Sequence, residues 1–545
     1  MTVVSPTADL RLPVRVRRYW RAAPVPLVLA AVFVAVGFAL PFAYLVVRNL
    51  HGDLLATLRD EHIAGPLGRT LALAFTTSIT TAVIGTALAW LLVRTDLPGR
   101  RWMRKLAPLP LVFPSFIGAF CFLAAFTEGG LLEQYVLAPL GVEQLWRIEG
   151  FGWAVLVLTL FTYPYVYLPV VARLAALPPS IEESARALGR TPRQTFNTVV
   201  LPQTLGAIGA GALLVFLYSL SEFGAVALLR YDTLTRSIYA STRSFDSRAA
   251  FASSLVLGLC AIVVIGGERR WAARRARTEA LGAGRSVVTY PLGRATAPAL
   301  GFVALVGFLS LCAPLAVLGQ WAWRGLSNGS ALHAERLFPA ARTTAMYGVV
   351  GACIAVVVVL PVAYLSVRHP RARIARATSA IVTTSFAFPG LIIGFAFVSL
   401  AQSAWVPEQL YLSPQLLVVA YVVHFGAQAL RASEVAVGGV PRRIGDAARA
   451  LGANGWRRFF RVELPLMRSG LAAGGGLVML SIMKELPATL LLIPNDSDTL
   501  ARRIWFATED LFYAQAGVFA LVLLFLSGVL TWLLTIRPLE RDGRV

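Results

Sequence analysis

Apolar stretches of about 20 residues, separated by short polar segments, run along the whole chain. A helix of this length crosses the hydrocarbon core of a bilayer, where lipid offers the backbone no hydrogen-bond partners outside the helix itself. The pattern therefore predicts an all-α polytopic membrane protein. Its twelve transmembrane helices are expected at residues 25–47, 67–93, 106–126, 150–172, 204–229, 249–267, 296–318, 340–367, 377–401, 414–436, 470–492 and 514–536.

Composition supports the membrane assignment, and charge predicts the orientation. Only 14% of the 545 residues are charged, whereas a soluble domain needs about 25%. The net charge of +22 follows the loops, with roughly 35 of the 50 lysines and arginines on the side of the N-terminus and about 11 on the other side. We therefore expect a multi-pass protein of the cell membrane with both termini in the cytosol. Nucleic-acid binding is disfavoured, because the basic runs follow this topology and lack interleaved aromatic residues.

The chain contains two similar halves of six spans each. Matching landmarks recur at an offset of about 274 residues early: Arg69-Thr70 with Arg342-Thr343, and Pro114 with Pro389. Later the offset is 263 for Glu222 with Glu485 and 266 for Asp232-Thr233-Leu234 with Asp498-Thr499-Leu500. An even number of spans inserts both halves the same way, which predicts a pseudo-twofold axis along the membrane normal and a pathway between the halves. The expected segments are a tail at 1–24, repeats at 25–267 and 296–536, a cytosolic linker at 268–295 and a tail at 537–545.

One polar, arginine-rich island occurs in both halves with identical spacing. The first copy runs from Glu183 through Gly189 to Pro202, and the second from Asp446 through Gly452 to Pro465. We expect short cytosolic helices at about 180–190 and 443–453, with Ser180 capping the first and a glycine ending each. A loop helix lying on the bilayer would explain one copy, but two copies between the fourth and fifth spans indicate docking of a repeated partner.

The island resembles the EAA motif of ABC importer permeases, whose coupling helix sits in a cleft of an ATP-hydrolysing subunit. It departs from the family pattern at Ser184, where alanine is usual, and at Asp446, where glutamate is usual. By this resemblance the acidic residues pair with cations of the partner, and the alanines permit close approach. The coupling residues so assigned are Glu183, Ser184, Ala185, Gly189, Leu201 and Pro202, with Asp446, Ala447, Ala448, Gly452, Leu464 and Pro465.

The whole chain is similar to the fused, twelve-span permeases of ferric-iron importers, most clearly from Lys484 to Thr489 and at Asp498-Thr499-Leu500. The resemblance implies a type I importer permease fold, two ABC ATPase subunits that bind ATP and Mg, and an extracytoplasmic substrate-binding protein. A phosphate-binding loop needs Gly-Lys-Ser/Thr, and the only two lysines, Lys105 and Lys484, do not follow a glycine. ATP hydrolysis is therefore expected outside this chain, which is predicted to be no enzyme and to hold no cofactor.

Acidic residues inside apolar spans are costly and usually functional. Glu222 lies 18 residues after Thr204 at the start of its span, which places it about 27 Å along the helix, near the outer end. Glu485 has the equivalent place in the second half, because it follows Asp446 by 39 residues, as Glu222 follows Glu183. We hypothesise that this pair lines the outer mouth of a cation pathway. The alternative is that each glutamate pairs with a nearby base such as Lys484 or Arg230.

Other reactive residue types favour packing roles. His424 is interpreted as a packed or hydrogen-bonded histidine. Tyr163, Tyr165 and Tyr167 are interpreted as packing or interface residues. No metal site is predicted, because the four cysteines fall in apolar spans with no CxxC pair and are expected to be buried small hydrophobes: Cys121, Cys260, Cys312 and Cys353.

The favoured function is therefore an ATP-driven importer permease working by alternating access. Ferric iron is the substrate favoured by resemblance, with thiamine, its phosphate esters or another small solute next. An ion-coupled secondary transporter would need protonatable groups near the middle of the membrane, and His424 is almost the only one. A scaffold without transport would leave the acidic pair and the two halves without a purpose.

Overall fold

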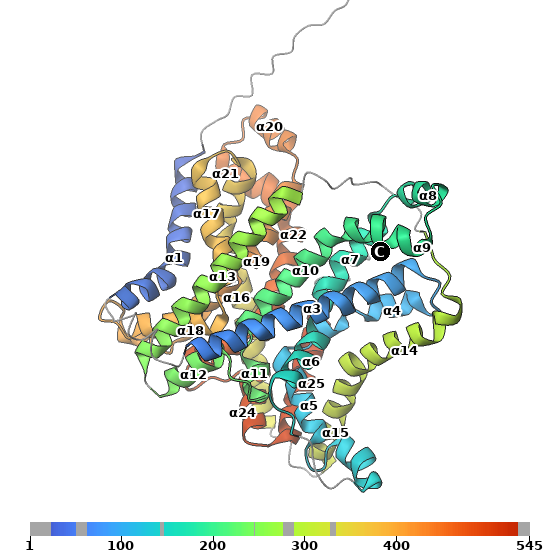
Figure 1. Ribbon diagram of the computed structural model, residues 1–545. Helices are drawn as coiled ribbons and strands as arrows, with labels where there is room; N and C mark the ends of the chain where they lie inside the picture. Colours follow the sequence, from blue (N-terminus) through green and yellow to red (C-terminus); the bar gives the residue numbers. More distant parts are fainter. Residues whose placement is uncertain are drawn as a thin grey trace, which may run out of the picture.

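The computed structural model describes residues 23–50, 63–141, 147–244, 246–275, 288–327, 334–531 and 533, and these residues are almost entirely helical (Figure 1). Their only β-type pairing is an isolated bridge between Thr95 and Tyr290. Most of both predicted tails and residues 276–287 of the predicted linker lie outside the described residues.

The first half begins with a long apolar helix and continues through shorter, broken ones. Its helices are α1 (Val25–Leu50), α3 (Ala64–Arg94), α4 (Arg100–Leu106), η1 (Leu109–Val112), α5 (Ser115–Phe126), η2 (Glu133–Leu137), η3 (Ala138–Leu140), α6 (Phe151–Thr162), α7 (Pro164–Ala176), α8 (Pro179–Ala187), α9 (Pro192–Thr195), η4 (Phe196–Val200), α10 (Leu201–Ser221), α11 (Gly224–Leu228), α12 (Leu234–Arg243) and α13 (Ser247–Arg275).

The second half repeats this order. Its helices are η5 (Gly293–Ala295), α14 (Thr296–Gly307), η6 (Phe308–Cys312), α15 (Ala313–Ser327), α16 (Ala334–Arg368), α17 (Arg373–Thr384), η7 (Ser385–Ala387), α18 (Gly390–Ala401), η8 (Glu408–Leu410), α19 (Pro414–Gly439), α20 (Arg442–Ala450), α21 (Gly455–Arg458), η9 (Phe459–Glu463), α22 (Leu464–Met483), α23 (Pro487–Leu492), α24 (Leu500–Glu509) and α25 (Tyr513–Thr531).

Ten of the twelve predicted spans correspond to helices that are long and apolar enough to cross a membrane, among the residues described. The prediction of single helices is wrong for 106–126 and 377–401. The first is bent by 95° between η1 and α5, and the second divides into α17 and α18. Each break coincides with a proline, Pro114 or Pro389, whose extended backbone precedes the next helix. Proline lacks the N–H that would continue the ladder.

Two further spans end earlier than predicted, and one helix continues further. The helix predicted to reach residue 229 stops at Ser221, and its counterpart predicted to reach residue 492 stops at Met483. A short second helix follows each stop, α11 and α23. In contrast, α13 continues to Arg275, into the segment predicted to be linker.

The two halves are interlocked through their first helices. α1 packs against α16, α17 and α18 of the second half, and the Phe38 ring fills the space beside Gly426 of α19. In return, α15 packs against α5, and Val303 and Val306 of α14 share a hydrophobic cluster with residues of α3 and α7. Each half therefore buries a helix of the other.

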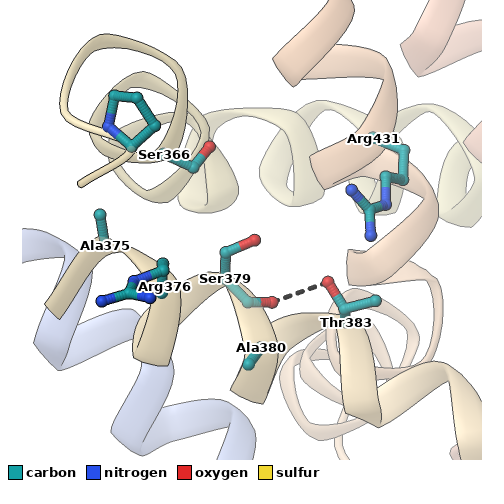
Figure 2. A pocket seen from close by; sticks show the side chains of 8 residues that line it. Ser366, Ala375, Arg376, Ser379, Ala380, Thr383 and Arg431 are labelled. Carbon is teal, nitrogen blue, oxygen red and sulfur yellow. Dashed lines mark hydrogen bonds between the residues drawn. The ribbon is translucent and has the colours of Figure 1, made fainter. Parts of the chain in front are cut away.

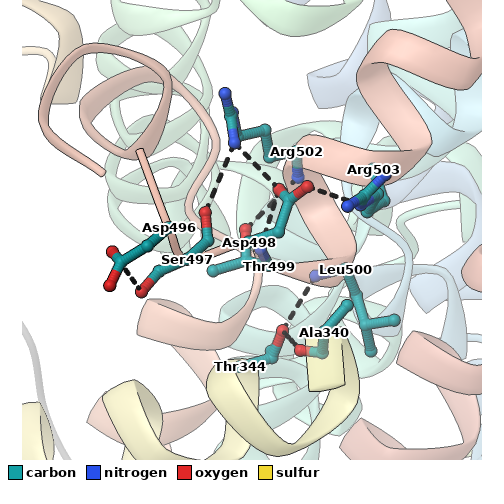
Figure 3. A network of polar contacts seen from close by, with 9 residues as sticks. All are labelled: Ala340, Thr344, Asp496, Ser497, Asp498, Thr499, Leu500, Arg502 and Arg503. Carbon is teal, nitrogen blue, oxygen red and sulfur yellow. Dashed lines mark hydrogen bonds and ion pairs between the residues drawn. The ribbon is translucent and has the colours of Figure 1, made fainter. Parts of the chain in front are cut away.

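In each half, a threonine hydroxyl accepts a hydrogen bond from the first backbone N–H of a short helix, α12 in the first half and α24 in the second. In the second half, the Thr344 hydroxyl accepts from the Leu500 N–H at 2.9 Å and donates to the Ala340 carbonyl at 2.7 Å (Figure 3). In the first half, Thr70 makes the same two bonds, with Leu234 and Pro66. Thr70 therefore corresponds to Thr344, and the predicted match with Thr343 is wrong by one residue.

Gly211 allows α10 to approach α7 closely. A methyl group at Gly211 would lie 2.6 Å from Val166 Cα and 2.7 Å from the Tyr165 carbonyl oxygen, both of them backbone atoms that cannot move aside cheaply. We expect Gly211→Ala to destabilise the protein by about 1–3 kcal/mol, because the clash outweighs the better helix propensity of alanine. Thermal unfolding in detergent measures the effect.

Gly301 of α14 provides the control, since no atom lies within 4 Å of a methyl group placed there. Gly301→Ala should leave the melting temperature unchanged or slightly raised. An equal loss of stability in both variants would contradict the proposed close approach.

Candidate functional site

Two short helices, α8 and α20, carry the repeated polar island on the surface of the molecule. Figure 1 shows them at the end of the molecule opposite α15 and α24. Glu183 and Ser184 of α8 are exposed, as are Asp446 and Ala447 of α20. The residue that follows the last residue of each helix is an exposed leucine: Leu188 is 83% exposed and Leu451 is 88% exposed.

Both helices end in the same way, as predicted. Gly189 and Gly452 adopt positive φ angles of 82° and 81°, a conformation that glycine tolerates without strain. The Arg190 N–H bonds to the Ala185 carbonyl at 3.2 Å, and the Ala453 N–H bonds to the Ala448 carbonyl at 3.0 Å. This is the Schellman pattern of helix termination, and it aims the two leucines in equivalent directions relative to their helices.

The predicted helix start is wrong in detail. α8 begins at Pro179 with Pro178 as its N-cap, and no side chain caps it, so Ser180 lies in the first turn. Pro441 has the same place before α20. Proline fixes the entry angle without needing a capping side chain, because the N–H it lacks would have no partner there.

The inner faces of both helices pack against the protein itself. Ala185 and Ala448 are 7% and 8% exposed, so the interpretation that these alanines offer a contact surface to a partner is wrong. Ala447 is exposed and keeps that possibility. Leu201-Pro202 and Leu464-Pro465 start α10 and α22, as predicted, each after a π-helical turn.

A buried ion pair fixes α8 to the transmembrane helices. Glu182 Oε1 lies 2.7 Å from Arg94 Nη1 at the end of α3, and both side chains are fully buried. Arg94 also donates to the Leu174 carbonyl of α7 at 2.7 Å, and the Tyr290 hydroxyl donates to Glu182 Oε2 at 2.6 Å. Burial, together with this hydrogen bond, raises the pKa of Tyr290 to about 12. The sequence analysis did not identify Glu182.

The second half fixes α20 differently. Gly445 stands at the position of Glu182, and the nearby acid is Glu463 of η9, outside α20. Glu463 lies 3.2 Å from Arg458 and accepts from the Tyr364 hydroxyl at 2.8 Å. A methyl group on Gly445 would lie 2.9 Å from Glu463 Oε1, so the glycine makes room for that carboxylate.

Glu222 holds the break after α10. One carboxylate oxygen accepts from the Ala225 N–H at 2.9 Å and the other from the Ser115 hydroxyl at 2.7 Å. Tyr218 in turn donates to Ser115 at 2.9 Å. Because Ser115 follows Pro114, the carboxylate connects the two helix breaks of the first half.

Glu485 has the equivalent place in the second half. It accepts from the Ala488 N–H at 3.1 Å, and its other oxygen lies 3.6 Å from His424 Nε2. Gly390 stands where the first half has Ser115, and a methyl group there would collide with the Glu485 carboxylate. His424 therefore faces an acidic partner that its sequence neighbourhood did not reveal.

The two glutamates lie near each other where the halves meet. A methyl group on Gly224, two residues after Glu222, would lie 3.4 Å from Leu486, the residue after Glu485, and both glutamate side chains are almost buried. Lys484 donates to the Leu111 carbonyl of the first half at 3.3 Å, and Leu486 approaches Gly224. Among the described residues, neither Lys484 nor Arg230 forms the alternative ion pair with these glutamates. The carboxylate nearest to Arg230 in an ion pair is Glu149, at 3.9 Å. The contacts of Lys484 with Leu111 and of Leu486 with Gly224 join the halves beside the glutamates.

The remaining sequence interpretations have mixed outcomes. Tyr163 and Tyr167 are buried and donate to backbone carbonyls of Ala107 and Arg104, which confirms packing. Cys121 is buried, but Cys312 and Cys353 are exposed, so their predicted burial is wrong. Within the described part of the chain, no group of three or more His, Cys, Asp or Glu side chains could hold a metal ion.

A polar cavity of about 290 Å³ lies between α16, α17 and α19 (Figure 2). Ser366, Ser379 and Arg431 line it, and all three bond to Glu434. The equivalent side chain to Glu434 in the first half is Val171, so this polar group belongs to the second half alone.

Comparison with known proteins gives matches over both halves. The model of the family described as binding-protein-dependent transport system inner membrane component matches residues 81–267 and again 336–541. The chain is 29% identical over 530 residues to the Fe(3+)-transport system permease protein FbpB 2 of Haemophilus influenzae, covering 94% of this chain and 98% of that protein. It is 31% identical over 202 residues to the sulfate transport system permease protein CysT of Salmonella typhimurium, covering 36% of this chain and 72% of that protein.

Adjacent glutamates allow a sharp test of the anchor under α8. Glu182→Gln should destabilise the protein by about 3–5 kcal/mol, because it leaves the buried Arg94 charge uncompensated. Glu183→Gln changes an exposed neighbour and should leave thermal unfolding unchanged. Equal melting temperatures for the two variants would show that the buried pair does not hold the helix.

Proposed function

The chain belongs to the family of binding-protein-dependent transport system inner membrane components, and we propose that it carries ferric iron across the cell membrane. Membership makes it an ABC importer permease, a transport component and not an enzyme, with both transmembrane domains in one polypeptide. We propose that two ABC ATPase subunits bind ATP and Mg at the face of α8 and α20. An extracytoplasmic binding protein would deliver the substrate at the opposite face, and both termini would lie in the cytosol.

The acidic pair is the observation that favours a cation as substrate. Glu222 and Glu485 come from the two halves, and each lies beside the contact between Gly224 and Leu486. Carboxylate oxygens are hard ligands that suit hard cations, whereas they repel sulfate. The iron permease of Haemophilus influenzae matches nearly the whole chain, while the sulfate permease of Salmonella typhimurium matches 36% of it. The charge of the pair thus agrees with the substrate of the relative that spans both halves.

The coupling proposal rests on what α8 and α20 expose and what they bury. Outward, each offers an acid, Glu183 or Asp446, and a leucine at its end. Inward, α8 is connected to α3 and α7 through Arg94. Force applied to α8 would therefore move these helices as one body.

The same body reaches the acidic pair. α10 packs against α3 and α7, and Glu222 follows its last residue. When ATP draws α8 and α20 together, the helices would pivot and separate the contacts of Lys484 with Leu111 and of Leu486 with Gly224. The interface beside the acidic pair would then open to the binding protein, which is alternating access driven from the cytosolic side.

Removing both carboxylate charges should abolish most transport. We expect Glu222→Gln combined with Glu485→Gln to lower ATP-driven iron uptake at least about tenfold, since each charge contributes roughly 1–4 kcal/mol to a cation 4 Å away. Glutamine keeps the acceptor oxygen for the Ala225 and Ala488 N–H groups, so folding should survive. Uptake of iron into vesicles containing the complete complex measures the effect.

Glu408→Gln, at an exposed position of η8, is the matched control and should transport normally. Stimulation of ATP hydrolysis by binding protein loaded with ferric iron, sulfate or thiamine identifies the substrate independently. Unchanged uptake in the double variant would remove the acidic pair from the pathway. Uptake that follows the proton gradient and survives ATP depletion would instead support an ion-coupled transporter.

The acidic residues of α8 and α20 should contribute unequally to the affinity for the ATPase. Asp446 is already paired with Arg449 on its own helix, while no such pair involves Glu183 among the described residues. Glu183→Gln should therefore weaken binding of the ATPase by about tenfold, and Asp446→Asn by less. Affinity of the purified permease for the ATPase, with Glu128→Gln as an exposed control, measures this. A larger loss with Asp446→Asn would contradict the assignment.

A further inference from the structure

A cavity of about 1130 Å³ opens beside α20 in the second half. It lies between α20, the end of α16 and the loop that follows α16. Its lining is rich in arginine: Pro24, Tyr364, Arg368, His369, Pro370, Arg371, Arg442, Gly445, Asp446, Arg449, Ala450, Arg458 and Glu463. Positive charges outnumber negative ones, because five arginines face one aspartate and one glutamate.

The two acids in this cavity are paired with arginines other than Arg368 and Arg442. Asp446 pairs with Arg449, and Glu463 pairs with Arg458. Arg442 donates only to backbone carbonyls, those of Val367 and Arg368. Burial, and then the charge of Arg442, lower the pKa of His369. The cavity therefore has a positive potential.

Arg368 is the counterpart of Arg94, but it is not paired with a carboxylate among the described residues. Arg94 and Arg368 are each the last residue of a long helix, α3 and α16. Arg94 is paired with the Glu182 carboxylate, whereas Gly445 stands at the position of Glu182 in the second half. Arg368 donates to the Val440 carbonyl at 3.1 Å, and its buried Nε has no hydrogen-bond partner. No carboxylate among the described residues lies within ion-pair distance of it.

Tyr290 adds a further contact to the buried ion pair of the first half. In the first half, its hydroxyl covers the Glu182 carboxylate, and its ring packs against Trp90 at 5.4 Å. In the second half, the counterparts of Arg94 and Glu182, Arg368 and Gly445, both line the open cavity. Among the described residues, no carboxylate pairs with Arg368 as the Glu182 carboxylate pairs with Arg94.

We propose that this cavity binds a phosphate-type oxyanion, which takes the part that the Glu182 carboxylate has in the first half. Arg368 and Arg442 would donate to its oxygens, as guanidinium groups do to phosphate. The anion would connect α16 to α20 as Glu182 connects α3 to α8. Because Arg368 ends a membrane-spanning helix, the phosphate can come from an anionic phospholipid headgroup or from free phosphate in solution.

Binding to the purified full-length chain tests the proposal. In detergent, inorganic phosphate should raise the melting temperature in a saturable way that chloride at equal ionic strength does not reproduce. In nanodiscs, phosphatidylglycerol should stabilise the chain relative to phosphatidylcholine if a lipid headgroup is the source. A response in either arm supports the site and identifies its source, and no response in either arm overturns it.

Two variants separate this cavity from general charge effects. Arg368→Gln should lower the apparent affinity for the responding anion at least about tenfold, while Arg461→Gln, an exposed arginine outside the cavity, should not. Gly445→Glu combined with Glu463→Val introduces the residues of the first half. This second variant should abolish the response by supplying an internal carboxylate, and it keeps the test decisive if Arg368→Gln does not fold. Equal responses in the wild type and both cavity variants would overturn the proposal.

The protonation of His369 gives an independent readout. A bound anion offsets the charge of Arg442, so the pKa of His369 should rise toward its usual value when phosphate is added. Titration of the His369 ring signal by NMR, with and without phosphate, measures this. A pKa that does not move while phosphate stabilises the chain would place the anion elsewhere and overturn the assignment.

Discussion

A helix that breaks inside a bilayer must satisfy its freed backbone groups from within the protein, because lipid provides neither donors nor acceptors. This constraint determines where the breaks of this chain can lie. The Glu222 carboxylate accepts from the Ala225 N–H and from Ser115, and so connects both breaks of the first half. Glu485 does the equivalent beside Gly390. Such groups can exist only where the two halves shield them from lipid, which is also where a solute can pass. The need to satisfy the backbone and the need for a polar path are met by the same residues.

The two halves have the same structure at the exposed helix ends, where a partner would bind. They differ in the buried ion pairs beneath these helices. The ends of α8 and α20 have matching glycine conformations and matching exposed leucines. Beneath them, the first half uses Arg94 with Glu182, while the second uses Arg458 with Glu463. A docking surface constrains geometry from outside, whereas a buried anchor needs only a compensated charge. One consequence of the second solution is that Arg368 remains without a carboxylate, and the basic cavity follows from that.

Much of this architecture could be predicted from sequence, because hydropathy and repetition are local signals. Ten spans, the two halves and the glycine stops follow from them. The breaks at Pro114 and Pro389 did not, since apolar residues on both sides of a proline form one apolar run. The pair of Arg94 with Glu182 joins residues 88 positions apart and has no local signature. The inward orientation of Ala185 likewise depends on how α8 is anchored, which only the folded chain shows.

We propose that closure of α8 and α20 opens the contacts that Lys484 and Leu486 make with the first half, beside the acidic residues. Spin labels at Leu188→Cys and Leu451→Cys, in a chain whose four native cysteines are replaced, would report the separation of α8 and α20 in the complete complex. Pulsed electron–electron double resonance, with and without a non-hydrolysable ATP analogue, measures this distance directly. The account predicts that the nucleotide shortens it. A distance distribution that the nucleotide leaves unchanged, in a complex that still transports, would contradict the account.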